Sequence, residues 1–252
     1  MIGAVGSRSS GGTEPRWYPL VVAASASTLI ISNILAVKLV ELFGLTLPAA
    51  VILFPVVYIL GDVLTEVYGY ARARQAIWIG FACNLLAVAA IWLAGRLPPA
   101  GFWNAQVYPG PVEASQAYQA ILGFTPRLLL ASFLAYLVGE FLNAFVLAKL
   151  KLATRGRWLW VRTIGSTLVG QAADSAIFIS TAFTGLLPGA ALGQAIVSQW
   201  LVKSGYEALA TPLTYLVVNG LKRAEGGEAF DRATDFRPIR LWTRPRASGG
   251  PG

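Results

Sequence analysis

Six long apolar stretches follow one another along the chain, separated by more polar segments. A helix needs about 20 predominantly apolar residues to cross a lipid bilayer, and each stretch has about that length. The pattern therefore predicts an all-α fold, a polytopic membrane protein with six transmembrane helices. The predicted spans are Trp17–Val40, Leu47–Tyr70, Ala76–Ala94, Arg127–Leu150, Arg162–Leu186 and Ala190–Leu221. The last span is long, and Pro212 predicts a kink in it or an end that lies along the membrane interface.

The composition supports a membrane protein and excludes several kinds of chemistry. Of the 252 residues, 56% are hydrophobic and 13% are charged, whereas soluble domains contain about 25% charged residues. The one cysteine, Cys83, excludes an internal disulfide, and the absence of histidine excludes histidine proton relays and Ser–His catalysis. No GxxxxGK[ST] motif occurs, so the chain is not itself an ATPase. We expect no metal site, no cofactor and no enzymatic activity.

Positive charge falls in alternate loops of the predicted topology. Arg72 and Arg74 follow the second span, a basic group from Lys149 to Arg162 follows the fourth, and Lys222 and Arg223 follow the sixth. Cytoplasmic loops carry the excess of Lys and Arg. We therefore predict a multi-pass protein of the inner (plasma) membrane with both termini cytoplasmic. Because the net charge of +8 lies mostly at span ends and in the tails, we expect no direct nucleic-acid binding.

Outside the spans, the sequence predicts two tails. Residues 1–16 are rich in Gly and Ser and are expected to be disordered. Residues 17–223 form the six-helix transmembrane domain. Residues 224–252 are polar, with Pro, Gly and Arg, and are expected to form a flexible cytoplasmic tail.

Five acidic residues lie inside the apolar stretches. Asp62 and Glu66 are one helical turn apart in the second span, and Glu140, Asp174 and Glu207 lie in the fourth, fifth and sixth. An acid at the centre of a spanning helix costs about 2.5–3.5 kcal/mol on a translocon scale. Ionisable residues in such positions usually mark a substrate or ion pathway. We therefore expect these side chains to point into the bundle.

Further polar and aromatic residues share helical faces with the acids at spacings of three or four. These residues are Tyr58, Tyr136, Asn143, Gln171, Phe178, Lys203 and Tyr206. The first span carries a milder polar stripe of Ser25, Thr28, Ser32 and Asn33. Pointed inward, the stripes form one polar cavity.

Other roles remain open for some of these residues. Asn143 and Gln171 are equally well explained as interhelical hydrogen-bond partners, worth about 0.6 kcal/mol each. Lys203 can serve the cavity or neutralise an acid, and we predict an ion pair between Lys203 and Glu207. Only Lys38 and Lys203 are clearly basic within the spans. The acids outnumber them, so some acids are protonated, hydrated or available to a cation or a donor-rich ligand.

Four segments carry a resemblance to a known family over about Ile31 to Arg223. They are FPVVYILGDVLTEVYGYARAR (Phe54–Arg74), SFLAYLVGEFLNAFV (Ser132–Val146), STLVGQAADSAIF (Ser166–Phe178) and KSGYEALATPLTY (Lys203–Tyr215). Through them the chain resembles the queuosine precursor transporter family, six-span bacterial proteins also described as vitamin-uptake-like. The resemblance implies uptake of 7-deazaguanine bases, such as 7-cyano-7-deazaguanine or 7-aminomethyl-7-deazaguanine, that supply queuosine in transfer RNA. The expected partners are this purine-like base and the lipid bilayer, and a homodimer is a candidate assembly.

The chemistry of such a base suits the stripes. Its N1–H and 2-amino group form a two-donor fork that a carboxylate accepts bidentately, and amide groups can serve the other edges. Aromatic rings can stack on the flat base for about 1–3 kcal/mol, by analogy with single-strand binders. The resemblance therefore implies a substrate-binding set of Asp62, Glu66, Glu140, Asn143, Gln171, Asp174, Lys203, Glu207, Tyr58, Tyr136, Phe178 and Tyr206.

Three other functions remain as alternatives. One is a substrate-binding membrane subunit for a vitamin-like ligand, energised by a separate ATPase; transport by the purified protein alone in liposomes would exclude it. Another is an intramembrane aspartyl-type enzyme, in which Asp62 and Asp174 would share a proton. The last is a non-transporting assembly protein, which should tolerate neutral replacement of the acids.

Overall fold

The computed structural model describes residues 15–42, 45–104, 106–123, 126–227, 229–231 and 234–239. Most of the predicted N-terminal tail, residues 1–14, lies outside the described residues, as do residues 240–252. The described helices are α1 (Tyr18–Leu35), α2 (Phe54–Tyr68), α3 (Tyr70–Arg96), α4 (Pro111–Leu122), α5 (Pro126–Ala153), α6 (Leu159–Phe183) and α7 (Gly189–Ala224). Two short strands, β1 (Leu39–Leu42) and β2 (Leu45–Pro48), and a 3-10 turn, η1 (Ala49–Ile52), connect α1 to α2.

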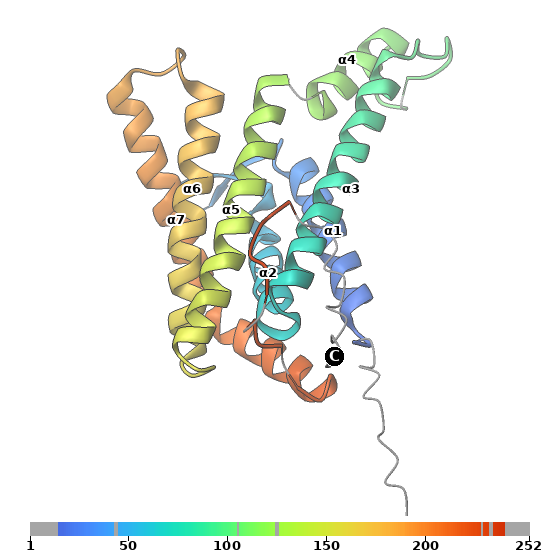
Figure 1. Cartoon of the computed structure of the whole chain (residues 1–252). Coiled ribbons are helices and arrows are strands. Elements are labelled where there is room, and N and C mark those ends of the chain that lie inside the picture. Colours follow the sequence, from blue (N-terminus) through green and yellow to red (C-terminus); the bar gives the residue numbers. More distant parts are fainter. Residues whose placement is uncertain are drawn as a thin grey trace, which may run out of the picture.

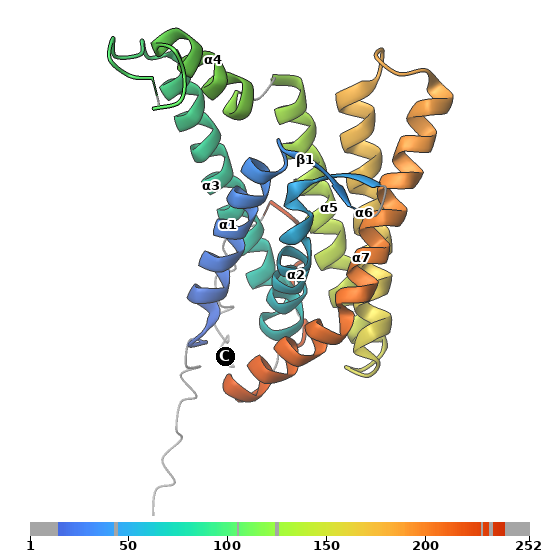
Figure 2. The same ribbon diagram turned by 180° about the vertical axis from the view of Figure 1, so that it is seen from behind.

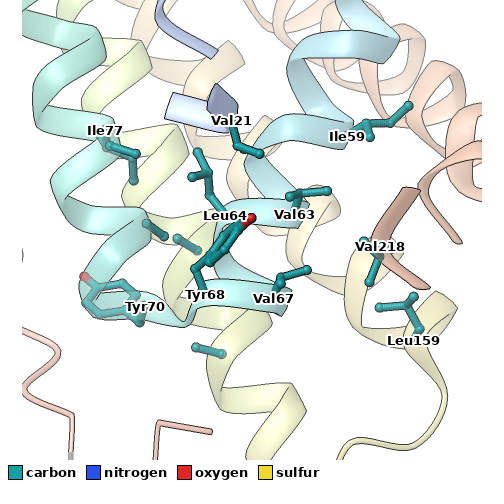
Figure 3. Packing of buried hydrophobic residues seen from close by; sticks show 14 residues of the cluster. Val21, Ile59, Val63, Leu64, Val67, Tyr68, Tyr70, Ile77, Leu159 and Val218 are labelled. Carbon is teal, nitrogen blue, oxygen red and sulfur yellow. The ribbon is translucent and has the colours of Figure 1, made fainter. Parts of the chain in front are cut away.

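The helices form a bundle around the short helix α2. Helices α5, α6 and α7 lie side by side, α1 packs on α3, and α2 contacts helices of both groups (Figures 1 and 2). Buried apolar side chains of α2, among them Val63 and Val67, pack with Ile77 of α3, Leu159 of α6 and Val218 of α7 (Figure 3). The apolar core therefore lies around the C-terminal half of α2.

Two glycines allow the close packing of α5 on α6. A Cβ atom on Gly139 would lie 2.9 Å from Cβ of Asp174, and one on Gly170 would lie 2.8 Å from Cβ of Asn143. Small residues at helix interfaces let the backbones approach closely, and this contact contributes much of the packing between membrane helices. The same contact holds the polar side chains of α5 and α6 beside each other.

Six of the helices match the predicted spans in order. By length and composition, three of them are long and apolar enough to cross a membrane: α1, α3 and Leu129–Ala153 of α5. Helix α2 has 15 residues, and α6 and α7 carry the polar stripes that lower their hydropathy. The chain is therefore a helical membrane protein, and the count of six spans and the orientation stay predictions.

Two connecting elements were not predicted. The all-α prediction omitted the antiparallel hairpin, in which Leu39 faces Pro48 and Leu42 faces Leu45. The first predicted span ran to Val40, but α1 ends at Leu35. The apolar residues of the hairpin extended the apparent span because hydropathy alone does not distinguish a short strand from the end of a helix. Helix α4 lies in the third loop, beside the end of α3 (Figure 1).

Helix α7 changes direction toward its C-terminal end. Figures 1 and 2 show its last turns running beneath the other helices. Pro212 lies inside this helix, where it removes one backbone hydrogen bond and clashes with the carbonyl one turn before it. The predicted change of direction in the last span is therefore present.

The chain after α7 differs from the flexible tail predicted from residue 224 onward. Asp231 is 5% exposed, and its carboxylate accepts hydrogen bonds from the backbone N–H of Tyr70 at 3.1 and 3.0 Å. Arg74, 1% exposed, donates to the backbone oxygens of Asp235 and Arg237. Residues from 229 to 238 that the structure describes thus contact the bundle, whereas Ile239 is 81% exposed. These residues carry no periodic pattern that would indicate this packing.

Candidate functional site: a cavity between the helices

A cavity of about 590 Å³ lies among α1, η1, α2, α5, α6 and α7. It is lined by the C-terminal parts of α1 and α6 and the N-terminal parts of α2, α5 and α7, and the exposed residues Ala36 and Ser198 lie on its wall. We call this half of the bundle the mouth end. Small-molecule sites usually have volumes of about 300–1,000 Å³, so the cavity has the size of a ligand site.

Most of the predicted site residues reach this cavity. Its wall includes Tyr58, Tyr136, Glu140, Gln171, Asp174, Phe178, Lys203 and Tyr206. A smaller pocket of about 40 Å³ shares several of these residues and adds Asn143 and Glu207. Asp62 and Glu66 line neither space. The structure therefore brings ten of the predicted residues together from four helices, α2, α5, α6 and α7.

One ion pair crosses the cavity wall between α6 and α7. Nζ of Lys203 donates to Oδ2 of Asp174, and both side chains are about one-fifth exposed. The predicted pair between Lys203 and Glu207 is therefore wrong. Glu207 instead accepts a hydrogen bond from Oγ1 of Thr167, deeper in the bundle. Because α6 and α7 run in opposite directions, Asp174 is the α6 acid that lies at the level of Lys203.

Glu140 lies between the helices that form the two spaces. It lines both of them, together with Tyr58 and Tyr136. Its carboxylate lies against Gly61 of α2, where a Cβ atom would be 3.4 Å from Oε2. The hydroxyl of Tyr136 donates to the backbone oxygen of Ile77 at 3.5 Å. Glu140 is thus a carboxylate on the cavity wall with aromatic rings beside it.

Three buried oxygen atoms near the cavity have no hydrogen-bond partner among the described residues. They are Oδ1 of Asp62, Oδ1 of Asn143 and Oε1 of Gln171. Asp62 is 1% exposed and lines neither the cavity nor the smaller pocket. A buried acceptor without a donor costs about 1–3 kcal/mol, more when it is charged. The site therefore has an excess of acceptors and suits a ligand that donates several hydrogen bonds.

Glu66 lies at the other end of the bundle, away from the cavity. Its carboxylate is fully buried and contacts Arg162 of α6 at 2.6 Å and Lys222 of α7 at 2.7 Å. Lys151 of α5 is 3.8 Å away. From hydropathy, these three cations were expected in loops or at span ends, where they only determine orientation. Their long side chains reach inward, so Glu66 is not among the unpaired acids.

Some cavity residues were absent from the predicted set. Ser32 and Asn33 of α1 line the cavity, and Nδ2 of Asn33 donates to Oδ1 of Asn84 at 2.8 Å. Ser132 of α5 and Gln199 of α7 also lie on the wall. The polar stripe of the first span indicated Ser32 and Asn33. They were outside the predicted set because the first span carries no acidic residue.

Comparisons with known proteins identify the family. A family model described as "Putative vitamin uptake transporter" matches residues 48–217. A Bacillus subtilis (strain 168) protein named "Probable queuosine precursor transporter" is 33% identical over 188 residues, which cover 74% of this chain and 78% of that protein. The "Queuosine precursor transporter" of Escherichia coli (strain K12) is 27% identical over 155 residues, 60% of this chain and 62% of that protein. No solved structure matches the chain.

The family and both relatives are named as transporters, so the alternative of an intramembrane enzyme falls away. The geometry agrees with this. Asp174 is paired with Lys203, and Asp62 does not line the cavity, so the two do not form an open aspartyl dyad on its wall. The chain belongs to the queuosine precursor transporter family, a family of vitamin-uptake-like membrane transporters.

Proposed function

We propose that this protein imports queuosine precursors, the 7-deazaguanine bases, and binds them in the cavity of α2, α5, α6 and α7. The names of the two relatives support this substrate class. The main support is a pair of buried acceptors on the walls of the two spaces, since Oδ1 of Asn143 and Oε1 of Gln171 have no donor among the described residues. A free 7-deazaguanine base offers donors at N1, at the 2-amino group and at N9.

The carboxylates on the wall are suited to the two-donor fork of N1 and the 2-amino group. Glu140 and Asp174 both line the larger cavity and the smaller pocket. Lys203 already neutralises Asp174, which leaves Glu140 as the acceptor for the fork in our proposal. The ammonium of Lys203 then donates to O6, the carbonyl oxygen beside N1. A carboxylate at that position would repel O6, because both groups are hydrogen-bond acceptors.

The aromatic residues supply flat surfaces for the base. Tyr58, Tyr136, Phe178 and Tyr206 lie around the cavity on four different helices. Base–aromatic stacking contributes about 1–3 kcal/mol per base in single-strand binders. In the proposed complex the amide oxygens of Asn143 and Gln171 accept from the two remaining donors, the second hydrogen of the 2-amino group and N9–H. The N9–H donor exists only in the free base, because a nucleoside carries its sugar at N9. The site should therefore prefer the base over a nucleoside.

The proposed topology follows the charge bias. Helices α1, α2, α3, α5, α6 and α7 cross the inner membrane, both termini are cytoplasmic, and the mouth end faces outward. The basic residues Lys151, Arg162 and Lys222 then lie at the cytoplasmic end. This orientation places the cavity where an imported base would enter.

Uptake in living cells tests the proposal. In a strain unable to make 7-deazaguanine bases, the wild-type gene should restore queuosine in transfer RNA from base supplied outside. Glu140→Gln should reduce the rate of restoration at least about tenfold, since it removes a charged acceptor from the fork. Gln194→Ala, at an exposed position of α7 that lines neither space, is the matched control and should behave as wild type. Failure of a well-expressed wild-type protein to restore queuosine would refute the substrate assignment.

A further inference from the structure

The end of the bundle opposite the mouth is closed by a buried ionic cluster. Glu66 is 0% exposed, and its Oε1 lies 2.6 Å from Nη2 of Arg162 and 2.7 Å from Nζ of Lys222. Nε of Arg162 donates to Oε2 at 3.3 Å. Lys151 Nζ donates to the backbone oxygen of Glu66 at 2.5 Å. Four helices, α2, α5, α6 and α7, thus meet at one carboxylate, and we call these four residues the Glu66 cluster.

The chain after α7 covers this cluster. Residues 229–231 and 234–239, which we call the strap, begin with Ala229, whose N–H donates to the backbone oxygen of Val67 at 2.9 Å. The backbone oxygen of Ala229 accepts from Nζ of Lys151 at 2.7 Å. Lys151 therefore belongs to both the cluster and the strap, and movement of one disturbs the other.

The strap is fixed at the break between α2 and α3. Asp231 accepts from the N–H of Tyr70, the first residue of α3, where a carboxylate stabilises the end of a helix. Gly69, at the break, has φ of +84°, and a Cβ atom there would lie 3.0 Å from Cβ of Ala229. The backbone of the break and the strap are therefore in direct contact.

Further contacts hold the strap along α3 and α5. Nη1 of Arg74 donates to the backbone oxygens of Asp235 at 2.8 Å and Arg237 at 2.6 Å. The ring of Phe236 packs on Tyr70, with centroids 5.0 Å apart, and on Phe145, at 5.5 Å. The strap joins these two helices by polar and aromatic contacts.

The end of α7 is fastened in a similar way. Glu225, directly after α7, accepts from the hydroxyl of Tyr68 and from the N–H of Trp17, both at 2.9 Å. Figures 1 and 2 show this last part of α7 lying across the bottom of the bundle. A single displacement of the chain from Lys222 onward would release the contacts of Lys222, Glu225 and the strap together.

We propose that the Glu66 cluster and the strap form the second gate of this transporter, the one that closes the binding cavity on the side opposite its mouth. Alternating access requires the central site to communicate with one side of the membrane at a time. Buried ion pairs suit a gate because the cost of desolvating the charges offsets much of their attraction, so little net energy opposes opening into water. Lys222 is 20% exposed, so water reaches the cluster from its side. Glu66 therefore acts in gating and makes no contact with the substrate.

Accessibility of a cavity cysteine tests the gate without any substrate. In full-length protein with Cys83→Ser, Ser132→Cys places one thiol on the cavity wall. An impermeant thiol reagent is applied to right-side-out and to inside-out membrane vesicles. The parent should label from the mouth side alone. Lys222→Gln and, independently, Asp231→Ala should raise the rate of labelling from the opposite side about tenfold or more, because each removes a charge-assisted hydrogen bond of the closed state.

The neighbouring residue supplies the matched control. Arg223→Gln removes an exposed charge one position from Lys222 and should label as the parent does. A single size-exclusion peak at the elution volume of the parent verifies that each purified variant folds. Labelling of the parent from both sides, or no gain in either variant, would overturn the gate. The gate proposal rests on the transport function, but this readout needs no 7-deazaguanine base, so a wrong substrate assignment would leave the result unchanged.

Discussion

The ion pair on the cavity wall predicts strong energetic coupling between Lys203 and Asp174. Lys203→Ala leaves the carboxylate of Asp174 without its partner, whereas the double variant with Asp174→Asn removes both charges. A fully buried pair loses about 3–5 kcal/mol when one partner is removed, and an exposed pair about 0–1. The two side chains are 21% and 19% exposed, so we expect about 2 kcal/mol for Lys203→Ala alone.

The double-mutant cycle isolates the pair from other effects of the substitutions. The free energy of unfolding is measured in mixed detergent micelles for the parent, both single variants and the double variant. The free energy of unfolding lost in the double variant should be smaller, by about 1–2 kcal/mol, than the sum of the losses in the two single variants. The matched control is the cycle of Lys203→Ala with Glu207→Gln, expected to be additive within about 0.5 kcal/mol, because Glu207 bonds Thr167 instead. A larger coupling to Glu207 than to Asp174 would refute the assignment of the pair.

Two further predictions concern packing and topology. Gly170→Ala should destabilise the protein by about 1–3 kcal/mol, since the new Cβ would lie 2.8 Å from Cβ of Asn143. Gly193 has open space around it, so Gly193→Ala should not destabilise the protein in the same unfolding measurement. Equal effects of the two substitutions would contradict the close α5–α6 contact. Single cysteines at Arg155 and Gly185, both exposed, should lie on opposite sides of the membrane. In intact cells an impermeant thiol reagent should label Gly185→Cys and leave Arg155→Cys unlabelled. The reverse pattern would overturn the orientation.

The positions of the main helices followed from hydropathy because burial in lipid imposes an apolar composition over a fixed length. The face of each helix followed from spacing, so Tyr136 and Glu140, four residues apart, both line the cavity. The inward direction of Asp174 and Gln171 likewise followed from the cost of placing polar groups against lipid. These features depend on local sequence and one environmental constraint.

Contacts that depend on how far one helix is shifted along its neighbour were not predictable from the sequence. Lys203 has Glu207 one turn away on its own helix, and its actual partner Asp174 comes from α6. The pairing depends on how far α6 slides along α7, which spacing within one helix does not contain. The partner of Glu66 was unpredictable for the same reason, because Arg162 comes from the start of another helix. The strap has no apolar periodicity that predicts its position. It is held by hydrogen bonds from Arg74 and Lys151 to its backbone oxygens.

Binding of matched bases to the purified protein distinguishes a 7-deazaguanine site from a site for another ligand. Isothermal titration with 7-cyano-7-deazaguanine and with its analogue lacking the 2-amino group compares a complete donor fork with a broken one. Loss of that donor leaves a buried acceptor unpaired, at about 1–3 kcal/mol, so the analogue should bind at least about tenfold more weakly. Equal affinities for the two bases, or binding of an unrelated vitamin with no binding of any 7-deazaguanine, would contradict the account.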